Sequence, residues 1–290
     1  KRAIEFQAAR LPVRRPKHGR LVLAYHGVAS DDAPARGERT LHLAAREFGA
    51  QMKALSSLGD VVTLRELLEA DHPNGRLIAV SFDDAYDSAL TYGIPQCAVR
   101  KIPCSVFVSP SLLAQVPPWD VLADNGTWTV SQREEFLWRG DALRPYQQTI
   151  VSDSFAMLRI ASESELRTML EEFPQVTLGN HTQHHLNLGA LSDEAVLREV
   201  TRADAWLRSF AAHRYLPFIA YPFGIPPRPA ALNTLLQSGE FGMLAQGGWM
   251  PSSARIHRFL LPRWNVPADV TLDGFRARVR GFFQKGPTYR

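Results

Sequence analysis

The sequence predicts an α/β protein whose strands close into an irregular (β/α)7–8 barrel. Two observations carry this prediction: short apolar, β-rich segments alternate with amphipathic segments, and about eight such strands are spread over 290 residues. Strands that alternate with helices favour a parallel sheet with right-handed crossovers. Barrels of this kind routinely reach such a length as one domain. No apolar run approaches the roughly 20 residues that a membrane-spanning helix needs.

The predicted strands are short segments rich in aliphatic, β-branched and aromatic residues. They span residues 21–28, 61–64, 77–83, 104–110, 176–181, 215–223, 242–246 and 259–266. The segments between them with helical character are residues 46–59, 163–173, 192–210, 228–239 and 271–283. In the first helical segment, Phe48, Met52, Leu55 and Leu58 are spaced to share one face. Ser192 is the predicted N-cap of the segment that it opens.

Residues 113–160 interrupt this alternation and are predicted to form an insertion over one end of the barrel. The insertion contains Trp119, Trp128, Trp138 and Tyr146. Such aromatic side chains can stack on sugar rings, but they more often pack a small satellite core, which is the favoured interpretation. We therefore expect one barrel domain over residues 21–290, preceded by a basic leader over residues 1–20.

The net charge of +4 comes from that leader, which holds seven of the 33 Lys and Arg but one of the 29 acidic residues. The leader is expected to be a solvated terminus, with peripheral contact to an anionic membrane surface or a partner as the alternative. The rest of the chain is slightly acidic, so no nucleic-acid binding is expected. Cys97 and Cys104 give neither a disulfide framework nor metal-type spacing, and two buried thiols are expected.

Polar residues stand at the C-terminal ends of several predicted strands. Asp83 and Asp84 close the segment 77–83, His181 closes 176–181, and His26 lies near the end of the first strand. In barrel enzymes the catalytic groups gather at this rim. Adjacent carboxylates repel each other, so the Asp pair indicates either a solvated turn or a nearby cation.

The histidines further along the chain favour the second interpretation, a cation near the Asp pair. His181 and His185 are four residues apart, which in a helical turn places both imidazoles on one face. With Asp84 they form a ligand set that leaves coordination positions open for water and substrate. Asp83 would then stay ionised and act as the base, while His184 points elsewhere or competes. Zn²⁺ is the preferred ion, with Co²⁺ or Ni²⁺ as alternatives.

These segments resemble the polysaccharide deacetylase family (carbohydrate esterase family 4, the NodB-homology domain). SFDDAYDS (81–88) is similar to its [TS]FDDG element, NHTQHHLNLGAL (180–191) to its H-[ST]-x-x-H element, and AYPFG (220–224) to its third element, usually R-x-P-Y-G. Between the first two, residues 92–110 resemble the family's helix and strand. The resemblance covers residues 21–266.

The departures from the family pattern are specific. Ala85 stands at the Gly of FDDG, and Ala220 at the Arg of the third element. Arg263, at another predicted strand end, is a candidate to replace that Arg, with a structural salt bridge as the alternative. The run LAYH, ending in His26, is similar to the poly-N-acetylglucosamine deacetylase branch, whose general-acid His comes from the first strand. His257 is the competitor for this role.

The resemblance implies metal-dependent removal of N-acetyl groups from a bacterial surface polysaccharide or exopolysaccharide, or its precursor. Asp83 would be the base, the backbone N–H of Phe223 would hold the oxyanion, and His26 would protonate the leaving amine. O-deacetylation, or deformylation or deacylation of a lipid-linked sugar, stays open, as does a catalytically inactive glycan-binding module. Because the sequence begins at Lys1 rather than Met, an upstream segment is expected, and the compartment, bacterial cytoplasm or periplasm, stays open.

Overall fold

The computed structural model describes most of the chain. The described residues are 19–70, 75–124, 157–237 and 261–281, with 126, 129, 131, 133, 242–246 and 250–251. The leader up to residue 18 lies outside them, as do Trp128, Trp138, Tyr146 and His257. Among the described helices, none combines the length and the apolar character that crossing a membrane requires.

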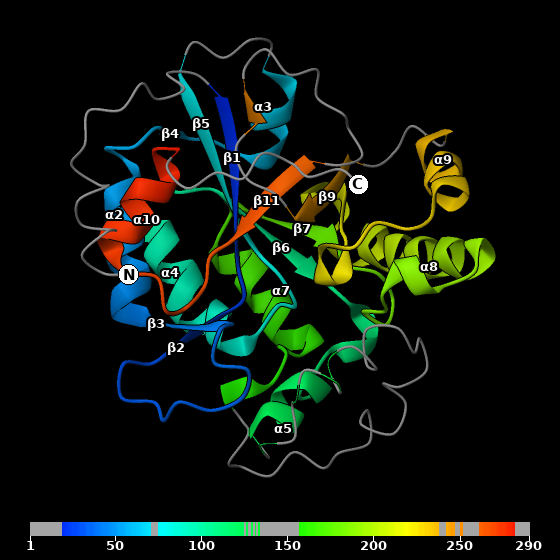
Figure 1. Ribbon diagram of the computed structural model, residues 1–290, viewed down its shortest axis with the longest axis horizontal. Coiled ribbons are helices and arrows are strands. Elements are labelled where there is room, and N and C mark those ends of the chain that lie inside the picture. Colours follow the sequence, from blue (N-terminus) through cyan, green and yellow to red (C-terminus); the bar gives the residue numbers. More distant parts are fainter. Residues whose placement is uncertain are drawn as a thin grey trace.

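A ring of seven parallel strands forms the centre of the molecule (Figure 1). The strands pair in the order β1, β5, β6, β7, β8, β9 and β11, and β1 pairs with both β5 and β11, so the sheet closes on itself. Their bounds are β1 (Gly19–Tyr25), β5 (Arg76–Phe82), β6 (Cys104–Val108), β7 (Val176–Asn180), β8 (Tyr215–Ala220), β9 (Gly242–Gln246) and β11 (Leu261–Asn265). The predicted α/β barrel is confirmed.

The predicted strand at residues 61–64 was wrong over its second half. Only β4 (Asp60–Val61) is extended there, beside β5, and helix α3 (Leu64–Glu69) begins directly after Thr63. The Thr63 hydroxyl accepts the N–H of Glu66, and the Glu66 carboxylate accepts the N–H of Thr63. This capping box starts a helix where the apolar run suggested a strand. The ring therefore has seven strands, within the predicted range of seven to eight.

Helices surround the ring (Figure 1). They are α2 (Ala45–Leu55), α4 (Ile94–Val99), α7 (Glu163–Glu172), α8 (Asp193–Ala211), α9 (Pro229–Gln237) and α10 (Leu272–Val279). The predicted face of α2 is buried, and the ring of Phe48 lies 5.0 Å from that of Tyr25 and 5.6 Å from that of Phe82. Ser192 caps α8 as predicted, since its hydroxyl accepts the N–H of Ala195. Cys97, on α4, and Cys104, on β6, are free, buried thiols.

Two small additions follow the strand ends. After β1, the chain forms β2 (Gly27–Ala29), which pairs with β3 (His42–Ala44). The described start of the insertion forms helix α5 (Pro118–Asp124), and the two ends of the insertion form a small apolar cluster of Val116, Val121 and Leu158. Trp119 packs into the main core instead of this cluster. The strand ends, β3 and α5 together provide the residues of the site below.

Candidate metal centre and catalytic rim

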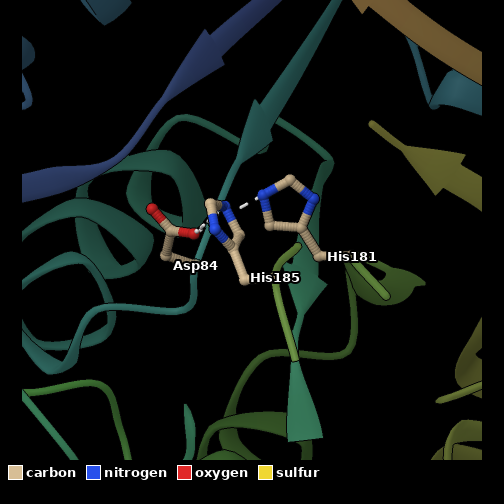
Figure 2. Close-up of side chains that lie close together, drawn as sticks. All are labelled: Asp84, His181 and His185. Carbon is tan, nitrogen blue, oxygen red and sulfur yellow. Dashed lines mark ion pairs between the residues drawn. The ribbon is translucent and has the colours of Figure 1, made fainter. Parts of the chain in front are cut away.

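The structure brings Asp84, His181 and His185 together (Figure 2). Asp84 follows β5, His181 follows β7, and His185 lies one turn further along the same loop. The Oδ1 atom of Asp84 lies 3.5 Å from Nε2 of His181 and 3.2 Å from Nε2 of His185. All three side chains are buried, with relative exposures of 2%, 2% and 4%. The arrangement matches the ligand set that the sequence predicted.

The hydrogen bonding of this cluster fits a cation. His181 donates from Nδ1 to the carbonyl oxygen of Ala220 at 2.7 Å, because a carbonyl only accepts. In the neutral ring that binds a metal, Nε2 then presents a lone pair to Asp84, whose Oδ1 is buried and has no hydrogen-bond partner among the described residues. A lone pair and a carboxylate oxygen facing each other, with no proton between them, are both satisfied by a divalent ion. One carboxylate and two imidazoles suit such an ion.

The backbone around the site adopts an uncommon conformation. Asp84, Ala85, Thr182, His185 and Phe223 have φ angles of 66°, 60°, 67°, 55° and 58°. Each such non-glycine residue costs on the order of 1–2 kcal/mol, and such residues cluster at functional sites. Ala85 stands where the related motif has Gly, so this chain accepts strain that glycine would not carry.

Asp83 and Arg263 form a buried, two-point ion pair. Nη1 and Nη2 of Arg263 donate to the two carboxylate oxygens of Asp83 at 2.6 and 2.8 Å. The side chains are 3% and 2% exposed. Burial alone would raise the pKa of Asp83, but nearby positive charge, above all that of the Arg263 guanidinium, lowers it below its ordinary value. Asp83 is thus ionised and fixed, while Ala220, at the family's Arg position, takes no part in the pair.

His26, directly after β1, also lies beside the carboxylate of Asp83. Its Nε2 atom lies 4.0 Å from Oδ2 of Asp83. Burial lowers the pKa of His26, and the carboxylates of Asp83 and Asp84 raise it only in part. The structure therefore sets a titratable imidazole beside the fixed carboxylate.

All seven residues singled out from the sequence line one cavity of about 360 Å³. Phe223 closes one side, with its ring 4.9 Å from that of His185. The cavity walls also include residues that the sequence analysis did not identify: Glu38, Thr40, Leu41, Arg133, Gly224, Ile225 and Asn265. Such a cavity, apolar in part with a few convergent polar groups, is typical of a small-molecule or sugar site.

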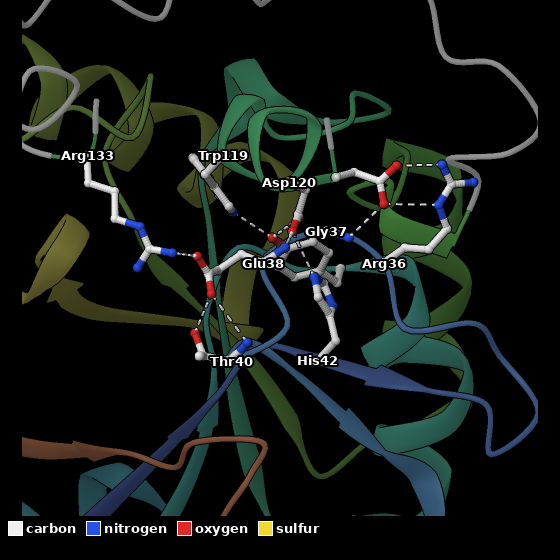
Figure 3. A network of polar contacts seen from close by, with 10 residues as sticks. Arg36, Gly37, Glu38, Thr40, His42, Trp119, Asp120 and Arg133 are labelled. Atoms are coloured by element: carbon white, nitrogen blue, oxygen red, sulfur yellow. Dashed lines mark hydrogen bonds and ion pairs between the residues drawn. The ribbon is translucent and has the colours of Figure 1, made fainter. Parts of the chain in front are cut away.

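Trp119 belongs to this site through a buried polar network (Figure 3). Its ring lies 4.6 Å from that of His185, and its Nε1 donates to the hydroxyl of Tyr86 at 2.8 Å. Tyr86 in turn donates to Asp120 at 2.6 Å, and Nε2 of His42 lies 2.9 Å from the other oxygen of Asp120. Asp120 is fully buried. The network fixes the indole against a predicted metal ligand, so Trp119 both packs and lines the cavity.

The same loops are joined by ion pairs (Figure 3), and two of the residues concerned, Glu38 and Arg133, line the cavity. Arg133 donates to the Glu38 carboxylate at 2.6 Å, and Arg36 donates to Asp124 at 2.5 and 3.1 Å. The hydroxyl of Thr40 donates to the other oxygen of Glu38 at 2.9 Å. The insertion is thereby tied to the segment between β2 and β3.

The fold and the cavity place this chain among the α/β barrel proteins whose chemistry lies at the C-terminal rim. A family model described as polysaccharide deacetylase matches residues 70–238, which is more than half of the chain. The protein therefore belongs to the polysaccharide deacetylase family, and this membership supports a hydrolytic deacetylase. A comparison with curated proteins finds no match.

Solved structures share the fold. IcaB from Ammonifex degensii is 19% identical, with a TM-score of 0.62 over 91% of this chain and 97% of its own. The Streptococcus pyogenes deacetylase PplD, in complex with acetate, is 14% identical, with a TM-score of 0.62 over 90% and 98%. The BpsB deacetylase domain from Bordetella bronchiseptica is 15% identical, with a TM-score of 0.55 over 88% and 98%.

The Asp-His-His cluster predicts that turnover depends on a bound divalent ion. Chelation should abolish activity, and His185→Ala should lose the ion because it removes one of three ligands. Metal content by mass spectrometry, before and after chelation, checks both statements. Full metal occupancy in a His181→Ala/His185→Ala double variant would contradict the ligand assignment.

The two-point contact of Arg263 predicts a specific defect in Arg263→Lys. Lysine keeps the positive charge but cannot hold both oxygens of Asp83, so turnover should fall about 10²-fold through misplacement of the carboxylate. The free energy of unfolding should fall by less than the roughly 3–5 kcal/mol that removing one partner of a buried pair costs. Steady-state kinetics and denaturant unfolding on one preparation check this. Wild-type turnover in the lysine variant would leave the pair a purely structural role.

Proposed function

We propose that this protein is a metal-dependent deacetylase that hydrolyses N-acetyl groups on sugars of a bacterial surface polysaccharide or exopolysaccharide, or its precursor. One observation carries the proposal. Asp83, held at 2.6 and 2.8 Å by Arg263, has His26 at 4.0 Å and shares a cavity with the Asp-His-His cluster. Amide hydrolysis needs a base for water and an acid for the leaving nitrogen, and these two side chains supply them.

Asp84, His181 and His185 are the residues that would hold the ion, with Zn²⁺ preferred and Co²⁺ or Ni²⁺ as alternatives. When bound, such an ion supplies Lewis-acid polarisation of the amide carbonyl and lowers the pKa of water. The orientation of His181 is set by its bond to the carbonyl of Ala220. The ring of Trp119, 4.6 Å from that of His185, packs against this second imidazole.

The remaining steps belong to the chain's own groups. Asp83 accepts the proton of the attacking water while Arg263 keeps its carboxylate in place. The backbone N–H of Phe223 donates to the oxygen on which negative charge develops, the role that the related motif gives its aromatic residue. The C–N bond then breaks as His26 gives a proton to the leaving nitrogen. The products are acetate and a free amino sugar.

Three features support a glycan as the substrate. The family is named for polysaccharide deacetylation, and one of the structures with this fold holds acetate, the product expected here. The cavity sets the aromatic Trp119 beside polar side chains, a composition suited to a sugar ring. The run LAYH, ending in His26, further favours the branch that acts on poly-N-acetylglucosamine.

Acetate release tests the proposal. The protein reconstituted with Zn²⁺ is incubated with N-acetylated and O-acetylated bacterial glycans, and acetate and bound metal are measured on the same sample. Acetate from the N-acetylated polymers is the expected result. Release from O-acetylated polymers alone would make the protein an O-deacetylase. Glycan binding without acetate from any polymer would make it an inactive binding module.

Asp83→Asn should separate the base from the metal ligands. The variant keeps the shape of the side chain but cannot accept a proton, so turnover should fall by roughly two to four orders of magnitude while the ion stays bound. Turnover and metal content, measured together, check this. Loss of the ion in Asp83→Asn would instead indicate that Asp83 is the ligand and Asp84 the base.

His26→Ala should abolish the alkaline limb of the pH–rate profile. A general acid acts only while protonated, so turnover falls as pH rises through its pKa. Because burial lowers the pKa of His26, this fall should be centred below the ordinary value of about 6.5. His257→Ala is the matched variant and should keep the limb. The reverse pattern, with the limb lost on changing His257 alone, would move the acid to the end of the chain.

A further inference from the structure

The loop that carries the two histidine ligands is strained. This loop follows β7. Two of its residues, Thr182 and His185, have φ angles of 67° and 55°. Neither is a glycine, so this geometry persists only where the surroundings impose it. The loop contributes two of the three predicted ligands. Whatever holds its backbone therefore also sets the positions of their imidazoles.

Helix α8 holds the loop through Glu199. One oxygen of the Glu199 carboxylate accepts the backbone N–H of His184 at 2.8 Å, and the other accepts Nδ1–H of the His184 ring at 2.7 Å. The backbone carbonyl of Glu199 accepts the N–H of Gln183 at 3.0 Å. Glu199 is only 8% exposed, and a carboxylate this buried must be compensated by hydrogen bonds. Both of these hydrogen bonds to the carboxylate come from His184, the residue directly before His185.

Asn180 ties the start of the loop to the same turn of α8. Its side-chain oxygen accepts the N–H of Thr182 at 2.8 Å, and its amide nitrogen donates to the carbonyl of Val200 at 3.0 Å. Asn180 is fully buried. Both halves of the loop are thus fixed to Glu199 and Val200, which are adjacent on the helix.

We propose that Glu199 is a positioning residue for the metal site, acting through His184 on the orientation of His185. His184 is not a ligand; its ring bonds to Glu199, away from the Asp-His-His cluster. This inference rests on the proposed function, because it assumes that the cluster binds a divalent ion. Partners behind metal ligands usually change metal affinity by about 10–100-fold when they are removed.

Zinc affinity of matched variants tests the proposal. Zn²⁺ dissociation constants are measured by competition with a chromophoric chelator, and the melting temperature of the metal-free protein is measured on the same samples. Glu199→Ala should weaken Zn²⁺ binding about 10–100-fold. Glu199→Gln keeps an oxygen that can accept the N–H of His184, so this variant should lose less Zn²⁺ affinity than Glu199→Ala.

Ser192→Ala is the control on the same helix. The Ser192 hydroxyl caps the start of α8 by accepting the N–H of Ala195, within the helix itself. Its loss should cost about 1 kcal/mol of stability, while Zn²⁺ affinity stays that of the wild type. His184→Ala removes only the ring bond and should weaken binding less than Glu199→Ala. In the Glu199→Ala background it should add nothing, because its partner is already gone.

The outcomes separate this inference from the proposed function. Wild-type protein that binds no Zn²⁺ overturns both. If the wild type binds Zn²⁺ and releases acetate, but Glu199→Ala and Glu199→Gln bind as tightly as it does, only the role of Glu199 is wrong. Equal losses of affinity in Glu199→Ala and Ser192→Ala would also overturn it, since general weakening of α8 would then explain the result.

Discussion

Closure of the barrel through β1 is the constraint on which the site depends. This strand lies between β5 and β11, in register with both, so that Tyr25 stands beside Phe82 and Val22 beside Arg263. The three strands bring His26, Asp83 and Arg263 together, although Asp83 and Arg263 are 180 residues apart in the chain. If β1 were not paired with both β5 and β11, Asp83 would not be held beside both His26 and Arg263.

Two groups of residues in the site are held in place by different parts of the fold. His26, Asp83 and Arg263 rest on the neighbouring strands β1, β5 and β11, where ladder hydrogen bonds fix the backbone. His181 and His185 instead stand on a strained loop after β7, held by the Glu199 side chain of α8 and by the indole of Trp119. Strain at Ala85 and Phe223 is likewise confined to the turns that follow strands. The regular sheet supplies the rigidity that these turns lack.

The sequence was sufficient for the features that depend on local pattern. Strand ends were visible as apolar runs closed by Asp83 and His181, and parallel strands place such ends at one rim. Arg263 was expected at a strand end too, but it lies in the middle of β11. The strand after residue 60 was misread because β-branched residues there precede a capping box, a short-range signal that overrides propensity. The Asp120 network could not be foreseen, since its partners lie 34 and 78 residues away in the chain.

The place of β1 in the ring also affects how the protein is made. All seven residues of β1 are buried, and the strand comes near the start of the described chain, whereas β11 comes near its end. During synthesis β1 can pair with β5 early, but its other edge waits until residues 261–265 have left the ribosome. The unpaired edge of an apolar strand is a template for pairing with strands of other chains. Contacts between segments far apart in the sequence also form slowly during folding. The nascent chain is therefore exposed to aggregation until β11 has been made.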